Sequence, residues 1–183
     1  MNLASLSEQP FELLLELERR ARASLVGRRE GEDEANERVA VGFRLGAESF
    51  VASRDEVKEV LPMPEGLTRV PGSKPWMKGI ANVRGHLLPV VDLKAFLGGG
   101  MTLPDRSARI LVASAREVPS GLLVDEVVGF RRFADQDYEE HSPATIIRCE
   151  NYLDGSYQRG DEKWPLFRLN KLLEDEQFLN AAE

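Results

Sequence analysis

Few side chains in this sequence are of types and at spacings that could do chemistry. His86 and His141 could each act as a general base, but neither has a nucleophile or an orienting carboxylate at a recognisable spacing. The chain contains no Gly-x-Ser-x-Gly sequence, which presents the nucleophile in many hydrolases, and the glycines at 98–100 lack the Gly-Lys-Ser/Thr ending of a phosphate-binding loop. One cysteine and two histidines also provide no metal-ligand spacing. We therefore expect a noncatalytic protein that holds neither a metal nor a cofactor.

Two further reactive side chains lie in apolar surroundings. Cys149 follows Ile146 and Ile147, which favours a buried, unreactive thiol, and as the single cysteine it cannot form a disulfide within the chain. Asp92 interrupts the apolar run 87–93, so its carboxylate either finds a hydrogen-bond partner or lies at the exposed end of a strand. A phosphoacceptor aspartate of the response-regulator kind needs alternating strands and helices, which this region lacks. Neither residue indicates an enzyme.

The clearest local pattern is a pair of apolar runs, residues 79–83 and 87–93, on either side of Arg84 and Gly85. Apolar runs bounded by a glycine are typical of buried strands that meet at a tight turn, because glycine supplies a positive φ at no steric cost. The pattern predicts a hairpin whose turn holds the Arg84 guanidinium at a fixed place. An ordinary hairpin with a surface arginine is the alternative.

Length and charge limit the other possibilities. The chain has 183 residues and a formal net charge of -7. The length predicts one core domain, and the charge disfavours general nucleic-acid binding, because phosphates require clustered Lys and Arg. The apolar start is too short for a signal peptide, and no apolar run approaches the ~20 residues that cross a membrane. We expect a soluble cytoplasmic protein without membrane insertion, whose partner is another protein.

An amphipathic helix is predicted near the N-terminus, at residues 11–26. Leu14, Leu17 and Leu25 recur at helical spacing, and acidic residues come early and arginines late, as the helix dipole favours. Residues 30–37 are too charged to offset their ordering entropy and predict a solvated linker. An isolated helix of this length is marginal in water, so we expect it to dock on its own domain or on a partner, with self-association equally possible. Residues 1–37 would then be an extension of a domain at 38–183.

From Val39 onward the pattern changes from helical to β. Short strands are predicted at residues 39–45, 50–52, 57–61, 79–83, 87–93, 109–113, 121–130, 145–149 and 163–167, the last as an edge strand because of Pro165. A C-terminal helix follows from Leu169. Many short strands with few helices between them indicate closed or nearly closed barrels, and argue against a doubly wound parallel sheet.

The hairpin region resembles the signature of CheW-like chemotaxis coupling domains. Gly-Ile-Ala-Asn-Val-Arg-Gly at 79–85 and Pro-Val-Val-Asp-Leu at 89–93 match the family pattern in residues and spacing, and further blocks match in order at 41–46, 57–60 and 121–127. The resemblance covers residues 39–173. It implies a mainly β fold of two intertwined SH3-like five-stranded β-barrels that share a core and bind no cofactor. It also implies a protein that couples the cytoplasmic tip of a methyl-accepting chemotaxis receptor to the regulatory domain of a CheA-type histidine kinase.

The resemblance also implies a partner-binding surface. It places Glu59 and Arg84 in an ion pair on adjoining strands, and a receptor-tip helix in an exposed groove that lies between the two barrels and is lined by valines. The partner-binding residues that it implies are Val57, Glu59, Val60, Asn82, Arg84, Val124 and Asp125, of which the three valines line the groove.

Within this family, the sequence most resembles one group of coupling proteins. Departures from the pattern at residues 51–53 and 163–167, together with the arginine-rich N-terminal segment, are most similar to the coupling proteins of the type IV pilus system that controls twitching motility. A coupling protein of a flagellar or other chemosensory array is the second possibility. A small β-barrel enzyme or ligand-binding module is the third, and it would need a deep pocket with convergent polar groups.

Overall fold

The computed structural model describes residues 37–103, 105–115 and 118–182, and Arg38–Glu183 forms one compact unit. The strands are β1 (Glu37–Leu45), β2 (Glu48–Ser53), β3 (Glu59–Pro62), β4 (Met77–Val83), β5 (His86–Asp92), β6 (Arg109–Ala115), β7 (Val118–Val124), β8 (Glu126–Ala134), β9 (Tyr138–Glu139), β10 (Leu153–Arg159) and β11 (Glu162–Phe167). The helices are the 3-10 turns η3 (Arg54–Glu56), η4 (Asp135–Asp137) and η5 (Glu150–Tyr152), and the α-helices α2 (Leu93–Phe96), α3 (Leu169–Leu173) and α4 (Glu176–Leu179). This part of the chain is therefore mainly β. The predicted N-terminal helix, with Leu14, Leu17 and Leu25, lies outside the described residues.

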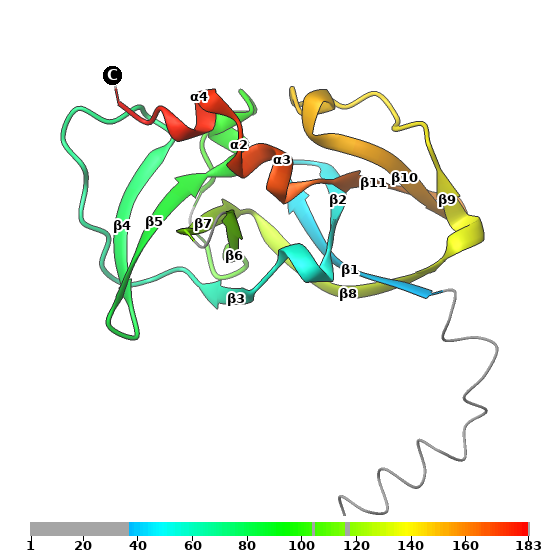
Figure 1. Ribbon diagram of the computed structural model, residues 1–183, viewed down its shortest axis with the longest axis horizontal. Helices are drawn as coiled ribbons and strands as arrows, with labels where there is room; N and C mark the ends of the chain where they lie inside the picture. The colour runs from blue at the N-terminus through cyan, green and yellow to red at the C-terminus, as the bar shows by residue number, and fades with distance from the viewer. Residues whose placement is uncertain (1–36, 104, 116–117, 183) are drawn as a thin grey trace, which may run out of the picture. The chain divides into compact units, whose positions relative to one another are not determined.

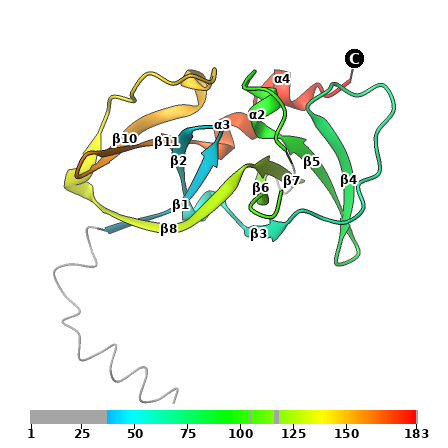
Figure 2. The ribbon, with the colours of Figure 1, turned by 180° about the vertical axis from the view of Figure 1, so that it is seen from behind.

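The strands form two sheets (Figure 1). One has six strands in the order β8-β1-β2-β11-β10-β9, and the other has five in the order β3-β6-β7-β5-β4. Seen from behind, β8 runs beside β1 at the edge of the six-stranded sheet (Figure 2). The prediction of two five-stranded barrels is therefore wrong in the strand count of this sheet. The additional strand is the two-residue strand β9, which pairs with β10.

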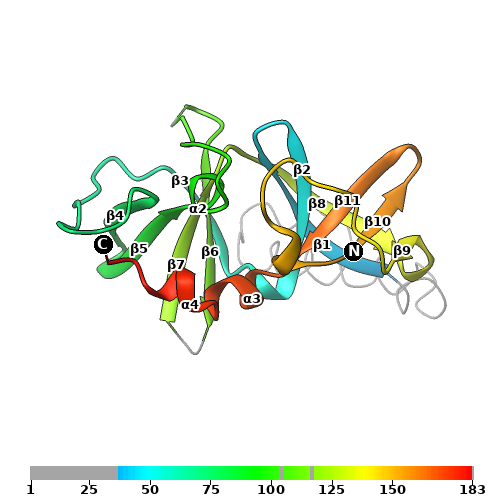
Figure 3. The same cartoon turned by 90° about the horizontal axis from the view of Figure 1, so that it is seen from above.

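The chain passes between the sheets at two points. After β2 it crosses through η3 to β3, and after β7 it crosses at Asp125 to β8. Figure 3 shows the two groups of strands from above, with β4–β7 on one side and β1, β2 and β8–β11 on the other. The single strand predicted at residues 121–130 is therefore two strands in different sheets. Both halves are rich in apolar residues, so their composition does not reveal the break.

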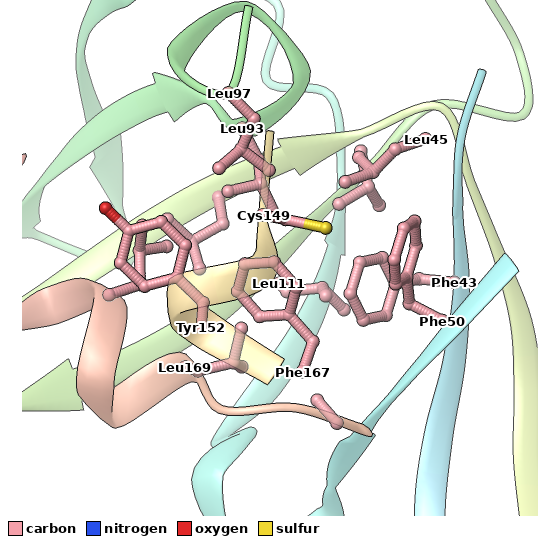
Figure 4. Close-up of a cluster of buried hydrophobic side chains, with 14 of the residues drawn as sticks. Phe43, Leu45, Phe50, Leu93, Leu97, Leu111, Cys149, Tyr152, Phe167 and Leu169 are labelled. Carbon is pink, nitrogen blue, oxygen red and sulfur yellow. The ribbon is translucent and has the colours of Figure 1, made fainter. Parts of the chain in front are cut away.

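A hydrophobic core lies between the sheets and contains residues from both. The Phe43 and Phe50 rings stack with 5.7 Å between centroids, and Phe167 meets them edge-on at 6.0 and 6.1 Å. Leu111 of the five-stranded sheet and Leu169 of α3 belong to the same cluster (Figure 4). The shared core that the family resemblance implied is therefore confirmed.

Each sheet also has a smaller apolar cluster of its own. In the six-stranded sheet the buried members are Ala40, Val51, Phe133, Tyr157 and Trp164, and in the five-stranded sheet they are Ala81, Leu88, Val90, Ala108, Ile110 and Leu123. Leu61 of β3 packs against the second cluster with Ala81 of β4, although β3 and β4 are opposite edges of that sheet. The five-stranded sheet therefore curves into a half-barrel that brings its two edges together.

Two predicted strands differ from the structure. Residues 145–149 are not a strand, because the Ile146 and Ile147 amides donate to the Glu48 carboxylate, at 2.8 and 3.1 Å, instead of to a neighbouring strand. The strand that contains Pro165 is not at an edge, since β11 lies between β2 and β10. Proline is tolerated there because β11 meets β2 at a single residue pair.

The predicted C-terminal helix is two short helices, α3 and α4. Asp175 separates them: its backbone is extended, and its carboxylate accepts a hydrogen bond from the Gln177 amide at 2.7 Å, which caps α4. The sequence predicted one helix from Leu169 and did not reveal this interruption.

Candidate functional site

Arg84 and Gly85 form a two-residue turn between β4 and β5, in which Val83 pairs with His86. Both turn residues have a positive φ, 53° at Arg84 and 84° at Gly85, as a type I′ hairpin turn requires. Among the described residues, Arg84 is the one non-glycine residue with a positive φ. The Asn82 side-chain oxygen accepts a hydrogen bond from the Gly85 amide at 2.9 Å and fixes the turn. The tight turn agrees with the sequence prediction, which had assigned the positive φ to glycine alone.

The predicted ion pair between Arg84 and Glu59 is confirmed. Arg84 Nη2 donates to Glu59 Oε1 at 2.6 Å, and Nη1 donates to Oε2 at 3.2 Å. The arginine side chain is 74% exposed and the glutamate side chain 36%, so the pair stabilises the fold by only about 0.2–1 kcal/mol. Its main effect is geometric, because two parallel hydrogen bonds hold the planar guanidinium in one direction.

The two residues of this ion pair do not lie on adjoining strands. Glu59 lies on β3, at one edge of the five-stranded sheet, whereas Arg84 follows β4, at the other edge. The predicted adjacency in the sheet is therefore wrong. The contact forms because the sheet curves into a half-barrel, so the ion pair joins its two edges.

The three valines predicted to line one exposed groove lie in different environments. Val60 of β3 is 38% exposed, and Val57 is half-buried against the shared core. Val124 is fully buried, because β7 is an inner strand with apolar clusters on both faces. The prediction that Val124 lines an exposed groove is therefore wrong, and Val57 and Val60 remain candidates.

Asp125 lies at the second crossing between the sheets, and its carboxylate is bound within the protein. Oδ1 accepts from Lys94 Nζ at 2.7 Å, and Oδ2 accepts from the Gly46 amide at 2.6 Å. The Asp125 amide donates to the Arg44 carbonyl at 3.1 Å. These contacts give Asp125 a structural role at the crossing, and a role in partner binding stays a prediction.

Asp92 ends β5 as a buried carboxylate with several donors. Oδ1 accepts from the Ala95 amide at 3.1 Å and from the Thr102 hydroxyl at 2.9 Å, and Oδ2 accepts from the Thr102 amide at 2.8 Å. The side chain thereby caps α2 and anchors the loop that follows it. Of the two possibilities that the sequence left open, the buried carboxylate with partners is the one observed.

Some exposed apolar side chains were not singled out from the sequence. Leu87, just after the Arg84 turn, is 70% exposed and pairs with Asn82 across the hairpin. Strand alternation could have revealed it, because the next residue, Leu88, is buried in the half-barrel. Phe130 of β8 and several loop residues are also exposed. Because Leu87 is exposed and lies next to the Arg84 turn, we add it to the candidate site.

The described residues contain neither a metal-binding cluster nor a reactive thiol. They contain no group of three or more His, Cys, Asp or Glu side chains that could hold a metal ion. Cys149 is fully buried, and burial raises the pKa of its thiol to about 11, so the thiol is protonated and unreactive near neutral pH. No helix in residues 37–103, 105–115 and 118–182 has the length and apolar character needed to cross a membrane.

Known proteins are similar to this chain in sequence or in fold. Residues 40–177 match the CheW-like domain family. The chain is 35% identical to Protein PilI of Pseudomonas aeruginosa over 175 residues, which cover 96% of this chain and 97% of that protein. It is 36% identical to the probable chemotaxis protein CheW of Rhizobium etli over 102 residues, 55% of this chain and 64% of that protein. The crystal structure of the scaffolding protein TtCheW from Thermoanaerobacter tengcongensis matches with a TM-score of 0.67 and 26% identity, over 76% of this chain and 94% of that chain. The chain therefore belongs to the CheW-like domain family, and CheW-like scaffolding proteins are noncatalytic.

Proposed function

We propose that this protein is an adaptor that couples the cytoplasmic tip of a methyl-accepting chemotaxis receptor to the regulatory domain of a CheA-type histidine kinase. The observation that carries the proposal is the Arg84 turn. The exposed guanidinium of Arg84 is held by Glu59, and the Arg84 backbone has a positive φ, which costs energy in a residue other than glycine. A strained residue persists when its surroundings hold it in place, and such residues cluster at functional sites. An ion pair this exposed contributes little to stability, which also favours a binding role.

The proposed partner surface surrounds the Arg84 turn. The exposed apolar side chains of Val60 and Leu87 supply contact area, and the guanidinium supplies direction and charge. The surface consists of Val57, Glu59, Val60, Asn82, Arg84 and Leu87, and we also assign Asp125, at the second crossing between the sheets, to partner binding. We place the protein in the cytoplasm, peripheral to membrane receptor arrays.

The proposed output is the type IV pilus chemosensory system that controls twitching motility. Similarity to PilI over nearly the whole length of both chains supports this assignment. The similarity to a probable chemotaxis protein CheW over about half of this chain supports the alternative, a flagellar or other array. Deleting the gene distinguishes them: loss of twitching with normal swimming supports the pilus system, and loss of swimming alone supports the alternative.

Binding of the purified proteins tests the coupling function directly. Isothermal titration calorimetry with the kinase regulatory domain, and then with a soluble receptor tip, should show binding to each, and gel filtration should show a ternary complex. Arg84→Asn should weaken binding. Arg44→Asn is a matched control, because it removes another exposed ion pair, that of Arg44 with Glu126 at 3.3 Å, away from the turn. Absence of binding to both partners would contradict the proposal.

We also propose that residues 38–183 are the coupling domain and that residues 1–37 are an extension with a docking helix at 11–26. Leu14, Leu17 and Leu25 would form its apolar contact face. A variant that lacks residues 1–36 leaves β1 complete, since β1 begins at Glu37. Equal stability with reduced partner binding or a lower oligomeric mass in analytical ultracentrifugation supports docking, including self-association. An aggregated or strongly destabilised remainder would show that the segment is required for the fold.

A further inference from the structure

The first crossing between the sheets contains a buried carboxylate. Glu56 is the last residue of η3, and its side chain is only 5% exposed. Oε1 accepts from Arg168 Nε at 2.9 Å, and Oε2 accepts from the Leu169 amide at 2.8 Å. Both oxygens are thus bound by donors that lie 112 and 113 residues later in the chain.

Both donors make further contacts that hold them in place. Leu169 is the first residue of α3 and is fully buried in the shared core. Arg168 is held a second time by Asp154 of β10, at 2.7 Å, and its amide donates to the Tyr152 carbonyl at 2.8 Å. Glu56 is therefore bound to a fixed point where β11 passes into α3.

The proposed partner surface begins directly after Glu56, at Val57. The Lys58 amide starts the pairing of β3 with β6, through a 2.8 Å hydrogen bond to a β6 carbonyl. Glu59, three residues beyond Glu56, holds the exposed guanidinium. Because so short a stretch of chain joins the buried carboxylate to the exposed one, a displacement of the first shifts the second.

We propose that Glu56 is a positioning residue, whose bonds to Arg168 and Leu169 set the direction in which β3 leaves the crossing and thereby place Glu59 for partner binding. The inference rests on the proposed coupling function. Glu56 does not contact the partner, because its side chain is buried and both its oxygens are occupied.

Glu56→Gln tests the proposal with little change in side-chain size. The carboxamide loses the charge that Arg168 pairs with, and it turns one acceptor into a donor that faces another donor. Glu48→Gln is the control, since both Glu48 oxygens also accept hydrogen bonds, in this case from the Ile146 and Ile147 amides, but Glu48 does not precede the partner surface. We expect Glu56→Gln to speed hydrogen exchange of the amides at 57–61 roughly tenfold and to weaken kinase binding by a similar factor. Glu48→Gln should leave both at their wild-type values.

A double variant separates positioning from general loosening. If Glu56 acts through the Glu59–Arg84 pair, Glu56→Gln should weaken kinase binding less in the Arg84→Asn protein than it does in the wild-type protein. Unchanged exchange at 57–61, full additivity, or an equal effect of Glu48→Gln would each overturn the proposal. If Glu56→Gln does not fold, Arg168→Lys, which keeps the charge but loses the forked contact, is measured in the same way. Hydrogen exchange needs no partner, so it decides the positioning role even if the kinase does not bind the wild-type protein.

Discussion

Replacing Arg84 by asparagine separates the role of the turn in binding from its role in folding. Asn-Gly is a preferred pair for a type I′ turn, because asparagine adopts a positive φ more readily than arginine. The substitution relieves the backbone cost of a φ of 53°, about 1 kcal/mol. It also removes an ion pair whose side chains are 74% and 36% exposed, which costs about 0.2–1 kcal/mol. These terms nearly cancel, so the free energy of unfolding should stay within about 1 kcal/mol of the wild-type value.

Partner binding should respond differently from stability in this variant. An arginine at the centre of an interface often contributes enough that its loss weakens binding tenfold or more, so we expect at least about a tenfold loss of affinity for the kinase domain or the receptor tip. Urea unfolding followed by circular dichroism measures the first quantity, and calorimetric titration the second, with Arg44→Asn as the control. A fall of more than about 2 kcal/mol in the free energy of unfolding would make Arg84 a structural residue. Wild-type affinity for both partners would refute its role in binding.

The remaining predictions concern the core and the buried polar groups. Val124→Ala should lower the free energy of unfolding by about 2 kcal/mol because it opens a cavity. Val60→Ala should change the free energy of unfolding by less than about 0.5 kcal/mol but weaken partner binding. A larger loss of stability for Val60→Ala than for Val124→Ala in urea unfolding would contradict the burial of these residues. Cys149 should react with a thiol reagent at about pH 8 only after unfolding. Folding raises the thiol pKa from 9.0 to about 11, so the contribution of the Cys149 thiol to stability should be complete below about pH 9 and fall as the pH approaches about 11. Equal reaction rates for folded and urea-unfolded protein would disprove this. Asp92→Asn should cost roughly 1–3 kcal/mol, since the Thr102 amide and hydroxyl lose a charged acceptor, and an unchanged thermal midpoint would count against it.

Local features of this protein could be predicted from its sequence. The apolar runs around Arg84 predicted the hairpin and its turn, and the apolar neighbours of Cys149 predicted a buried thiol. The family pattern gave the ion pair with Glu59 and the core that the two sheets share. The turn and the thiol depend on a few residues close together in the chain, where conformational preference and burial act most directly.

The tertiary structure alone decided which of these residues meet and which are exposed. Val124 and Val60 have the same side chain, yet one is buried and the other exposed, because β7 is an inner strand and β3 an edge. Glu59 reaches Arg84 only because the five-stranded sheet curves until its edges meet. Glu56 gave no sequence signal, since its donors lie more than a hundred residues away. Side-chain periodicity shows which residues share a face of a strand, but curvature and sheet order depend on contacts between distant segments.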